Sequence, residues 1–353
     1  MSPITDLIRP LVEVEEVGEH ELHIFLSRTE WEGDLKLNVA LNREDGLVVK
    51  SSLAARGLFA EDDRWRAYAD FGAAYLGPPD GDEELTWTIV RGGAQYFTPE
   101  ILGVRPLLWL GGELQHRQRL DLGLLTYQWE SLRAALAVQK GLGELSYIML
   151  GAGATRERLG RLEALAGEPA STRYADTRAM ALAEAALVFD EEALRIDQRH
   201  ELVMEGWYLA PSERDLAWRF GWRYQKAWTY GYNDLIARSS GALMGGDVIF
   251  PYDEPVGERH LRGVFGRVYY VEQVGSAAIE LRLSVTRDVL KLGLFADGAA
   301  FARDLDRVFA VSFGGSLHAL VTQMFQLNVY IAVGYASDGN QGHGFSVQLK
   351  KAF

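Results

Sequence analysis

The sequence predicts an all-β fold, a closed antiparallel transmembrane β-barrel of about 16 strands with a long loop folded into its lumen. Apolar and polar residues alternate with a period of two through most of the chain, which is the pattern of strands with one apolar and one polar face. Many segments run to about ten residues, as tilted membrane strands do, whereas strands of soluble sheets usually have ~5 to 6 residues. The polar faces carry Gly, Ser, Asn, Gln and charged residues, as a watery interior requires.

The alternation is clearest in residues 35–42, 277–285 and 325–334. In the second of these segments, Glu280 and Arg282 interrupt a row of aliphatic residues in mid-strand. Charged residues at such positions need water or polar partners on their side of the sheet. We therefore expect the aliphatic face to meet lipid and the charged face to line the lumen.

The whole pattern maps onto a single domain, 1–353, with two long connections at about 157–172 and 231–275. An even number of strands places both chain termini at the same end of the barrel. The segment 157–196 also fits an amphipathic helix, because short Ala-rich runs are ambiguous. The strands are expected near 21–30, 34–43, 47–57, 65–77, 84–97, 104–118, 121–138, 143–156, 173–189, 193–209, 214–230, 276–287, 289–302, 307–320, 324–337 and 343–353.

One predicted strand, 214–230, carries an unusual row of aromatic residues on a single face. Such a row is typical of the girdle at a membrane interface. An aromatic core face of a soluble antiparallel sheet shows the same pattern and stays as an alternative. The residues of the row are Trp218, Phe220, Trp222, Tyr224, Trp228 and Tyr230.

Composition excludes several functional classes. The chain has no Cys, which rules out disulfides, thiolate nucleophiles and cysteine-based zinc sites, and its 7 His residues lack the spacing of metal ligands. A net charge of -13 argues against a nucleic-acid partner. The chain contains no phosphate-binding Gly-rich loop and no GxSxG elbow, so we expect neither an enzyme nor a cofactor. No apolar run is long enough for a membrane helix. Residues 1–17 lack the features of a signal peptide, so we expect the sequence to be a mature form or a fragment of a longer precursor.

The C-terminal strand resembles the assembly signal of outer-membrane barrels. Phe345, Val347, Leu349 and Phe353 share one face, interrupted by Lys351, and the chain stops on the aromatic residue. This resemblance implies a bacterial outer-membrane location, with the lipid bilayer and the outer-membrane assembly machinery as partners.

Two further motifs resemble the BamA-type superfamily of assembly and translocation barrels, the bacterial surface antigen family. The sequence Leu261-Arg262-Gly263-Val264-Phe265 is similar to the family's Val-Arg-Gly-aromatic loop motif. Phe295-Ala296-Asp297-Gly298-Ala299 is similar to its Phe-x-Asp-x-Gly strand motif. Val264 and Ala299 depart from the family pattern, which puts the packing of the loop tip in doubt. The resemblance covers residues 257–353, and over 1–256 it rests on strand pattern alone.

The motifs imply a loop clamp, the name we use for a contact between Arg262 and Asp297. An arginine at a loop tip can fold inward and donate two parallel hydrogen bonds to a lumen carboxylate, and Gly263 permits a tight backbone there. Leu261 and Phe265 would pack beside it, as would Phe295 and Gly298 on the strand. From the residues alone, a solvated Arg262 and an unconnected lumen charge stay as the alternative.

The resemblance implies a barrel for protein insertion or translocation that acts through the lateral seam, the junction of its first and last strands. A client β-barrel or passenger polypeptide would pair with the open edges, and Gly339, Gly342 and Gly344 lie near the last edge. The family usually carries periplasmic domains before the barrel. About twenty residues precede the first predicted strand, so we expect no periplasmic repeat domain in this chain.

Three other functions are consistent with the strand pattern. The first is a membrane anchor or translocator for an upstream passenger, as in patatin-type lipases, which resemble this family at their C-terminal end. A passive pore is the second alternative. A soluble β-sandwich or lectin-like binder is the third, because amphipathic strands look alike in both settings.

Overall fold

The computed structural model describes most of the chain between residues 26 and 351, and everything below refers to that part. The described residues are 26–28, 31–42, 46–57, 59–60, 62–76, 84–119, 122–164, 174–189, 200–210, 216–246, 252–257, 260–262, 269–287, 289–303, 306–320 and 325–351.

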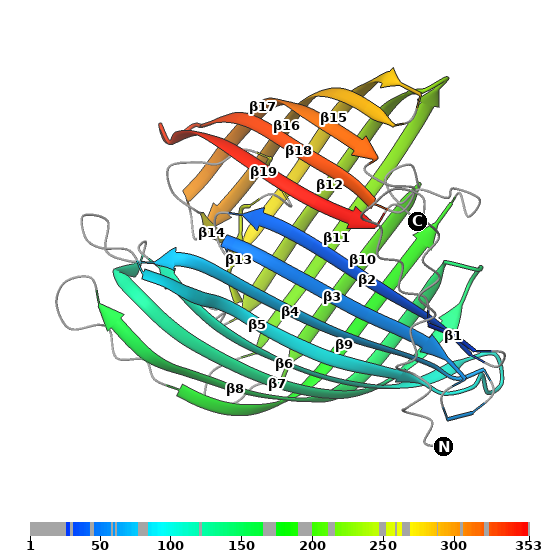
Figure 1. Ribbon diagram of the computed structural model, residues 1–353. Helices are drawn as coiled ribbons and strands as arrows, with labels where there is room; N and C mark the ends of the chain where they lie inside the picture. The colour runs from blue at the N-terminus through cyan, green and yellow to red at the C-terminus, as the bar shows by residue number, and fades with distance from the viewer. Residues whose placement is uncertain are drawn as a thin grey trace.

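Within these ranges the protein is all-β, as predicted, and one large antiparallel sheet contains 17 strands (Figure 1). None of the described segments is a helix long and apolar enough to cross a membrane. The strands are β1 (Leu26–Arg28), β2 (Trp31–Asn42), β3 (Gly46–Arg56), β4 (Arg64–Leu76), β5 (Glu84–Phe97), β6 (Arg105–Arg119), β7 (Leu124–Gly141), β8 (Tyr147–Ala164), β9 (Tyr174–Val188), β10 (Glu201–Leu209), β11 (Ala217–Tyr230), β12 (Asn233–Gly246), β15 (Gln273–Thr286), β16 (Leu290–Arg303), β17 (Asp306–Leu320), β18 (Phe325–Ala336) and β19 (Gln341–Lys351), while β13 (Glu254–Pro255) and β14 (Tyr270–Val271) form a separate ribbon.

Long strands that follow one another along the chain pair antiparallel from β2 to β19, and β12 pairs with β15 across the ribbon β13–β14. The first and last long strands meet over two residue pairs, Gln348 with Ala40 and Leu349 with Val39. Figure 1 shows β2 and β19 side by side, with the rest of the two edges diverging. The short strand β1 folds back on the start of β2. Closure of the barrel, and the number of strands around it, stay predictions.

The two faces of the sheet have opposite chemistry. On β15, Ile279, Leu281 and Leu283 are 43–51% exposed, whereas Glu280 and Arg282 between them are 1% and 2% exposed. A soluble protein buries its aliphatic residues and exposes its charges, so this arrangement is inverted. It fits an outer surface made for hydrocarbon around a polar interior, and it counts against the soluble β-sandwich.

The predicted long connection 231–275 is wrong at its start. Residues 233–246 form strand β12, so the connection begins after Gly246. The large apolar residues of β12 lie on both faces: Ile236 and Met244 are buried on the inner face, whereas Leu243 is 38% exposed on the outer face, so the usual alternation is lost. On its outer face, Gly241 and Gly245 pair with Trp222 and Trp218 of β11, which lie so close that a Cβ on either glycine would meet the indole ring. The aromatic neighbours cover the two positions at which β12 has no side chain of its own.

The other corrections concern the ambiguous segments. Residues 157–164 continue β8, so the connection predicted from 157 begins later, and 174–188 form β9. The helical interpretation is therefore wrong for these described residues. The strand predicted at 21–30 is described as the three-residue β1, and the rest of that range lies outside the described residues.

The aromatic row of β11 lies on the outer surface, as predicted for a girdle. Trp218, Phe220, Trp228 and Tyr230 are 37–66% exposed, while Arg219 between the first two is turned inward. The rings therefore face the surroundings of the sheet and not a second layer of described protein.

Candidate functional site

The connection between β12 and β15, here called the inner loop, lies against the inner face of the sheet. Its described residues are 252–257, 260–262 and 269–272. Leu261 is 1% exposed and belongs to a buried apolar cluster that joins the loop to β12, β15, β16 and β17. Removing these side chains from water stabilises the folded-in position of the loop. The cluster consists of Ala242, Val256, Leu261, Tyr269, Val271, Val274, Ala299, Phe301 and Ala310.

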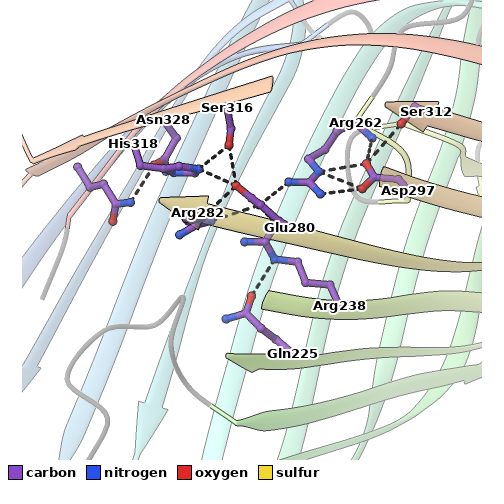
Figure 2. A network of polar contacts seen from close by, with 11 residues as sticks. Gln225, Arg238, Arg262, Glu280, Arg282, Asp297, Ser312, Ser316, His318 and Asn328 are labelled. Atoms are coloured by element: carbon purple, nitrogen blue, oxygen red, sulfur yellow. Dashed lines mark hydrogen bonds and ion pairs between the residues drawn. The ribbon is translucent and has the colours of Figure 1, made fainter. Parts of the chain in front are cut away.

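Next to this cluster, Arg262 contacts Asp297 on β16 through both its side chain and its backbone (Figure 2). Its Nη2 donates to Asp297 Oδ1 at 2.7 Å, its Nε donates to Oδ2 at 3.0 Å, and its backbone N–H donates to Oδ2 at 2.8 Å. This is the two-pronged geometry in which arginine binds a carboxylate most strongly. The guanidinium carbon lies 3.8 Å from the ring centroid of Phe295, which adds a cation–π contact.

The third nitrogen of the same guanidinium, Nη1, donates to Glu280 on β15. Burial lowers the pKa of Arg262, but the hydrogen bonds with Asp297 and the charge of Glu280 outweigh it, so the pKa lies above its ordinary value. Arg262 is therefore a permanent cation held between two carboxylates. A buried charge is tolerated only when it is paired in this way.

Glu280 is the centre of a wider polar network on the inner face (Figure 2). Its carboxylate lies 3.2 Å from Arg238 of β12 and 3.0 Å from Arg282 of β15. On β17 it accepts a hydrogen bond of 2.8 Å from Ser316 and lies 2.7 Å from His318 Nε2. Because these groups come from three strands and the loop, they connect the loop to the wall as one unit.

The start of the inner loop contacts β6 and β11. Asp253 pairs with Arg119 at the end of β6 at 2.9 Å, and Glu254 pairs with Arg219 of β11 at 2.9 Å. At the end of the loop, Tyr269 donates a hydrogen bond of 2.9 Å to Asp338 in the turn after β18. The inner loop thus bridges strands that are not neighbours in the sheet.

The loop narrows the interior without filling it. A polar cavity of about 610 Å³ remains between the loop residues Tyr252–Pro255 and strands β3 to β11. Charged side chains such as Arg91 and Glu113 line it together with Trp109 and Trp129. The cavity is wide enough for water and small solutes beside the loop.

The structure brings together part of the predicted loop site. Leu261, Arg262, Phe295 and Asp297 form the contacts above, and Gly298 lies beside Asp297 on β16. A Cβ on Gly298 would find no atom closer than 4.0 Å, so nothing in the packing there requires glycine. Gly263 and Phe265 lie outside the described residues.

The predicted C-terminal signal belongs to the last strand, β19. Phe345 is 54% exposed on its outer face, with Val347 half-buried on the same face. Leu349 pairs with Leu327 of β18 and with Val39 of β2. Phe353 lies outside the described residues, and the role of these side chains in assembly stays a prediction.

Sequence reasoning missed most of the Glu280 network. The mid-strand charges at 280 and 282 indicated a need for partners, but the partners come from positions far away in the sequence. Arg238 lies on the unrecognised strand β12, and Ser316 and His318 lie two strands away on β17. The inward parity of Ser312, Ser316 and His318 is the signal that would have found the β17 side.

Comparisons with known proteins bear on the fold. No family model matches the chain, and no curated protein matches it in sequence. The crystal structure of BamA from Haemophilus ducreyi lacking POTRA domains 1-3 superimposes with a TM-score of 0.64 at 12% identity, covering 91% of this chain and 70% of that one. The chain shares the BamA fold.

Two structures of CdiB give the same result. CdiB from Acinetobacter baumannii has a TM-score of 0.61 at 10% identity, covering 92% of this chain and 60% of that chain. CdiB from Escherichia coli has a TM-score of 0.57 at 11% identity, covering 90% and 63%. The chain therefore spans between 60% and 70% of the length of these three proteins.

Proposed function

We propose that the protein is a closed β-barrel of the bacterial outer membrane that inserts or translocates other polypeptides through its lateral seam. The shared fold with BamA and CdiB supports this, as does the apolar outer surface around a polar interior. The lipid bilayer, the outer-membrane assembly machinery and a client polypeptide are the partners that follow from it.

The observation that carries the proposal is that the two strands at the seam pair over far fewer residues than either pairs with its other neighbour. β19 pairs with β18 from Gln341 to Lys351 and β2 pairs with β3 from Gly33 to Asn42, but β2 and β19 share two residue pairs. Unpaired backbone N–H and C=O groups are costly in hydrocarbon. A client strand that pairs with either edge removes this cost, so the seam favours the entry of a strand.

The loop clamp acts on the same half of the barrel. Asp297 and Glu280 lie on β16 and β15, and the chain reaches the seam at β19 through β17 and β18. We infer that the clamp keeps the strands next to the seam in register while the seam itself opens. The inner loop then narrows the lumen.

A seam locked by a disulfide tests this function. The chain has no cysteine, so the pair Ala40→Cys/Gln348→Cys introduces a single cross-link at a paired position of the seam. Proteoliposomes that contain the reduced variant should accelerate the folding of a urea-denatured eight-stranded barrel, and oxidation should abolish the acceleration.

The pair Val329→Cys/Val347→Cys is the matched control, because it cross-links β18 to β19 away from the seam. Oxidation of this pair should leave the acceleration intact. Equal acceleration by the oxidised seam variant would refute insertion through the seam.

A further inference from the structure

The outer surface carries an open groove of about 580 Å³ across strands β5 to β9. Its floor is made of small outward residues, Gly92, Gly112, Ala134 and Ala154, and Leu132 forms a wall. Elsewhere on this surface large aliphatic side chains project outward. The size of the groove falls within the range of ~300–1,000 Å³ that is common for ligand sites, and its apolar lining suits a hydrocarbon chain.

A second hollow of about 480 Å³ lies further along β7 and β8, and charged side chains line it beside apolar ones. Exposed Arg158 and Arg161 line it together with Gln128 and Glu130, while exposed Arg156 lines the adjoining end of the apolar groove. Among the described residues that line the two hollows, Glu130 alone is acidic. The polar end is therefore basic, in a chain whose net charge is -13.

The position of this surface matches a membrane boundary. On β7 the outward residues between Glu130 and Lys140 are all apolar. Ten residues of a strand tilted by about 40° rise roughly 25 Å, which is the height of the apolar band of an outer-membrane barrel. The apolar groove lies inside this band and the arginines lie at its edge.

The arginines mark the end of the barrel opposite to the chain termini. β8 runs from the β7–β8 turn, at the end where the termini lie, towards Ala164, and Arg156 to Arg161 occupy its second half. The long connection after Gly246 leaves from the same end as Ala164. Outer-membrane barrels have short periplasmic turns and longer extracellular loops, so this end faces outward.

We propose that β5–β9 form a binding site for lipid A, the phosphorylated glycolipid of the outer leaflet, with an acyl chain in the groove and a phosphate at Arg156 and Arg158. This rests on the proposed outer-membrane location. Guanidinium groups bind phosphate through paired, charge-assisted hydrogen bonds. An amphipathic anion matches both halves of the surface, with its charge at the arginines opposite and beside Glu130 and its apolar part in the groove.

Native mass spectrometry of the full chain, released from nanodiscs of phosphatidylcholine with a minor fraction of diphosphoryl lipid A, tests the site. The parent should retain lipid A, and Arg156→Ala/Arg158→Ala should lower the retained fraction about tenfold, the usual effect of losing a charge-assisted contact. Ala134→Leu/Ala154→Leu, which fills the groove, should lower it by a similar factor.

The matched controls are Arg307→Ala and Ala300→Leu, because both residues are exposed on the other half of the barrel. Neither should change retention. Heat-modifiable gel migration shows independently whether the chain has folded in the bilayer. A chain that folds in bilayers but shows no preference for lipid A would refute the lipid A site without contradicting the proposed function. Equal retention of phosphatidylglycerol, unchanged retention in the arginine variant, or a dimer that is lost in the groove variant would each overturn it.

Discussion

The backbone N–H and the guanidinium group of Arg262 both donate to the carboxylate of Asp297, which lies 35 residues further along the chain. The guanidinium also reaches Glu280 on the neighbouring strand. One loop residue thus ties the inner loop to β15 and β16 together. Because the three groups are buried, Arg262 depends on the two carboxylates to compensate its charge.

Arg262→Ala should free the inner loop, destabilise the barrel by about 3 kcal/mol and raise the single-channel conductance. The reason is that it leaves Asp297 buried without its main partner. Urea unfolding in detergent measures the first effect and planar-bilayer recording the second. Asp297→Ala should give a similar loss, and the double variant should lose less than the sum of the two, since the residues form one pair. A large, steady conductance that is the same in the parent and the variants would favour a passive pore.

Glu280→Gln should destabilise the protein more than Asp297→Asn does, by an additional ~1 to 2 kcal/mol. The neutral amide would leave Arg238, Arg262 and Arg282 close together without their common counter-charge. Denaturant midpoints of the two variants provide the comparison, with exposed Glu84→Gln as a control that should match the parent. A midpoint for Glu280→Gln equal to that of the control would mean that the network does not stabilise the barrel.

Neighbouring glycines on β17 allow a matched test of packing beneath the clamp. A Cβ on Gly314 would lie 2.1 Å from the carbonyl oxygen of Ile331 and 2.5 Å from the ring of Phe295, on which Arg262 stacks. Gly314→Ala should therefore cost about 1–3 kcal/mol through overpacking. Gly315→Ala should be close to neutral because the nearest atom lies at 3.8 Å. If the thermal unfolding midpoint shifts by the same amount in both variants, the effect of the substitutions comes from strand propensity and not from the close contact.

How far the sequence predicts the fold depends on which face carries the bulky residues. Around Glu280 the aliphatic residues point outward, so period-two patterning locates the strand and its faces correctly. β12 was missed because its large apolar residues are divided between the two faces and the rings of Trp218 and Trp222 cover the glycines on its outer face. That arrangement is visible only when β11 and β12 are paired, which a single sequence does not reveal.

In the candidate site, too, one contact could be predicted from the sequence and others could not. The meeting of Arg262 and Asp297 is suggested by two motifs that stand close to known patterns. The contacts of Glu280 with Arg238 and His318 depend on the strand order and on the register between strands. Neither is set by local sequence, because the partners are separated by 42 and 38 residues.

Alternating contact of β15 with lipid and with the lumen can be measured directly by spin labels. Single cysteines at positions 278 to 283 of the cysteine-free chain, labelled after reconstitution into bilayers, report collisions with oxygen from the hydrocarbon and with a water-soluble nickel chelate. Ile279, Leu281 and Leu283 should give high oxygen accessibility, and Ala278, Glu280 and Arg282 should give low values, in strict alternation. Low oxygen accessibility at all six positions, or a chain that stays monomeric in water without detergent, would contradict a membrane-spanning barrel.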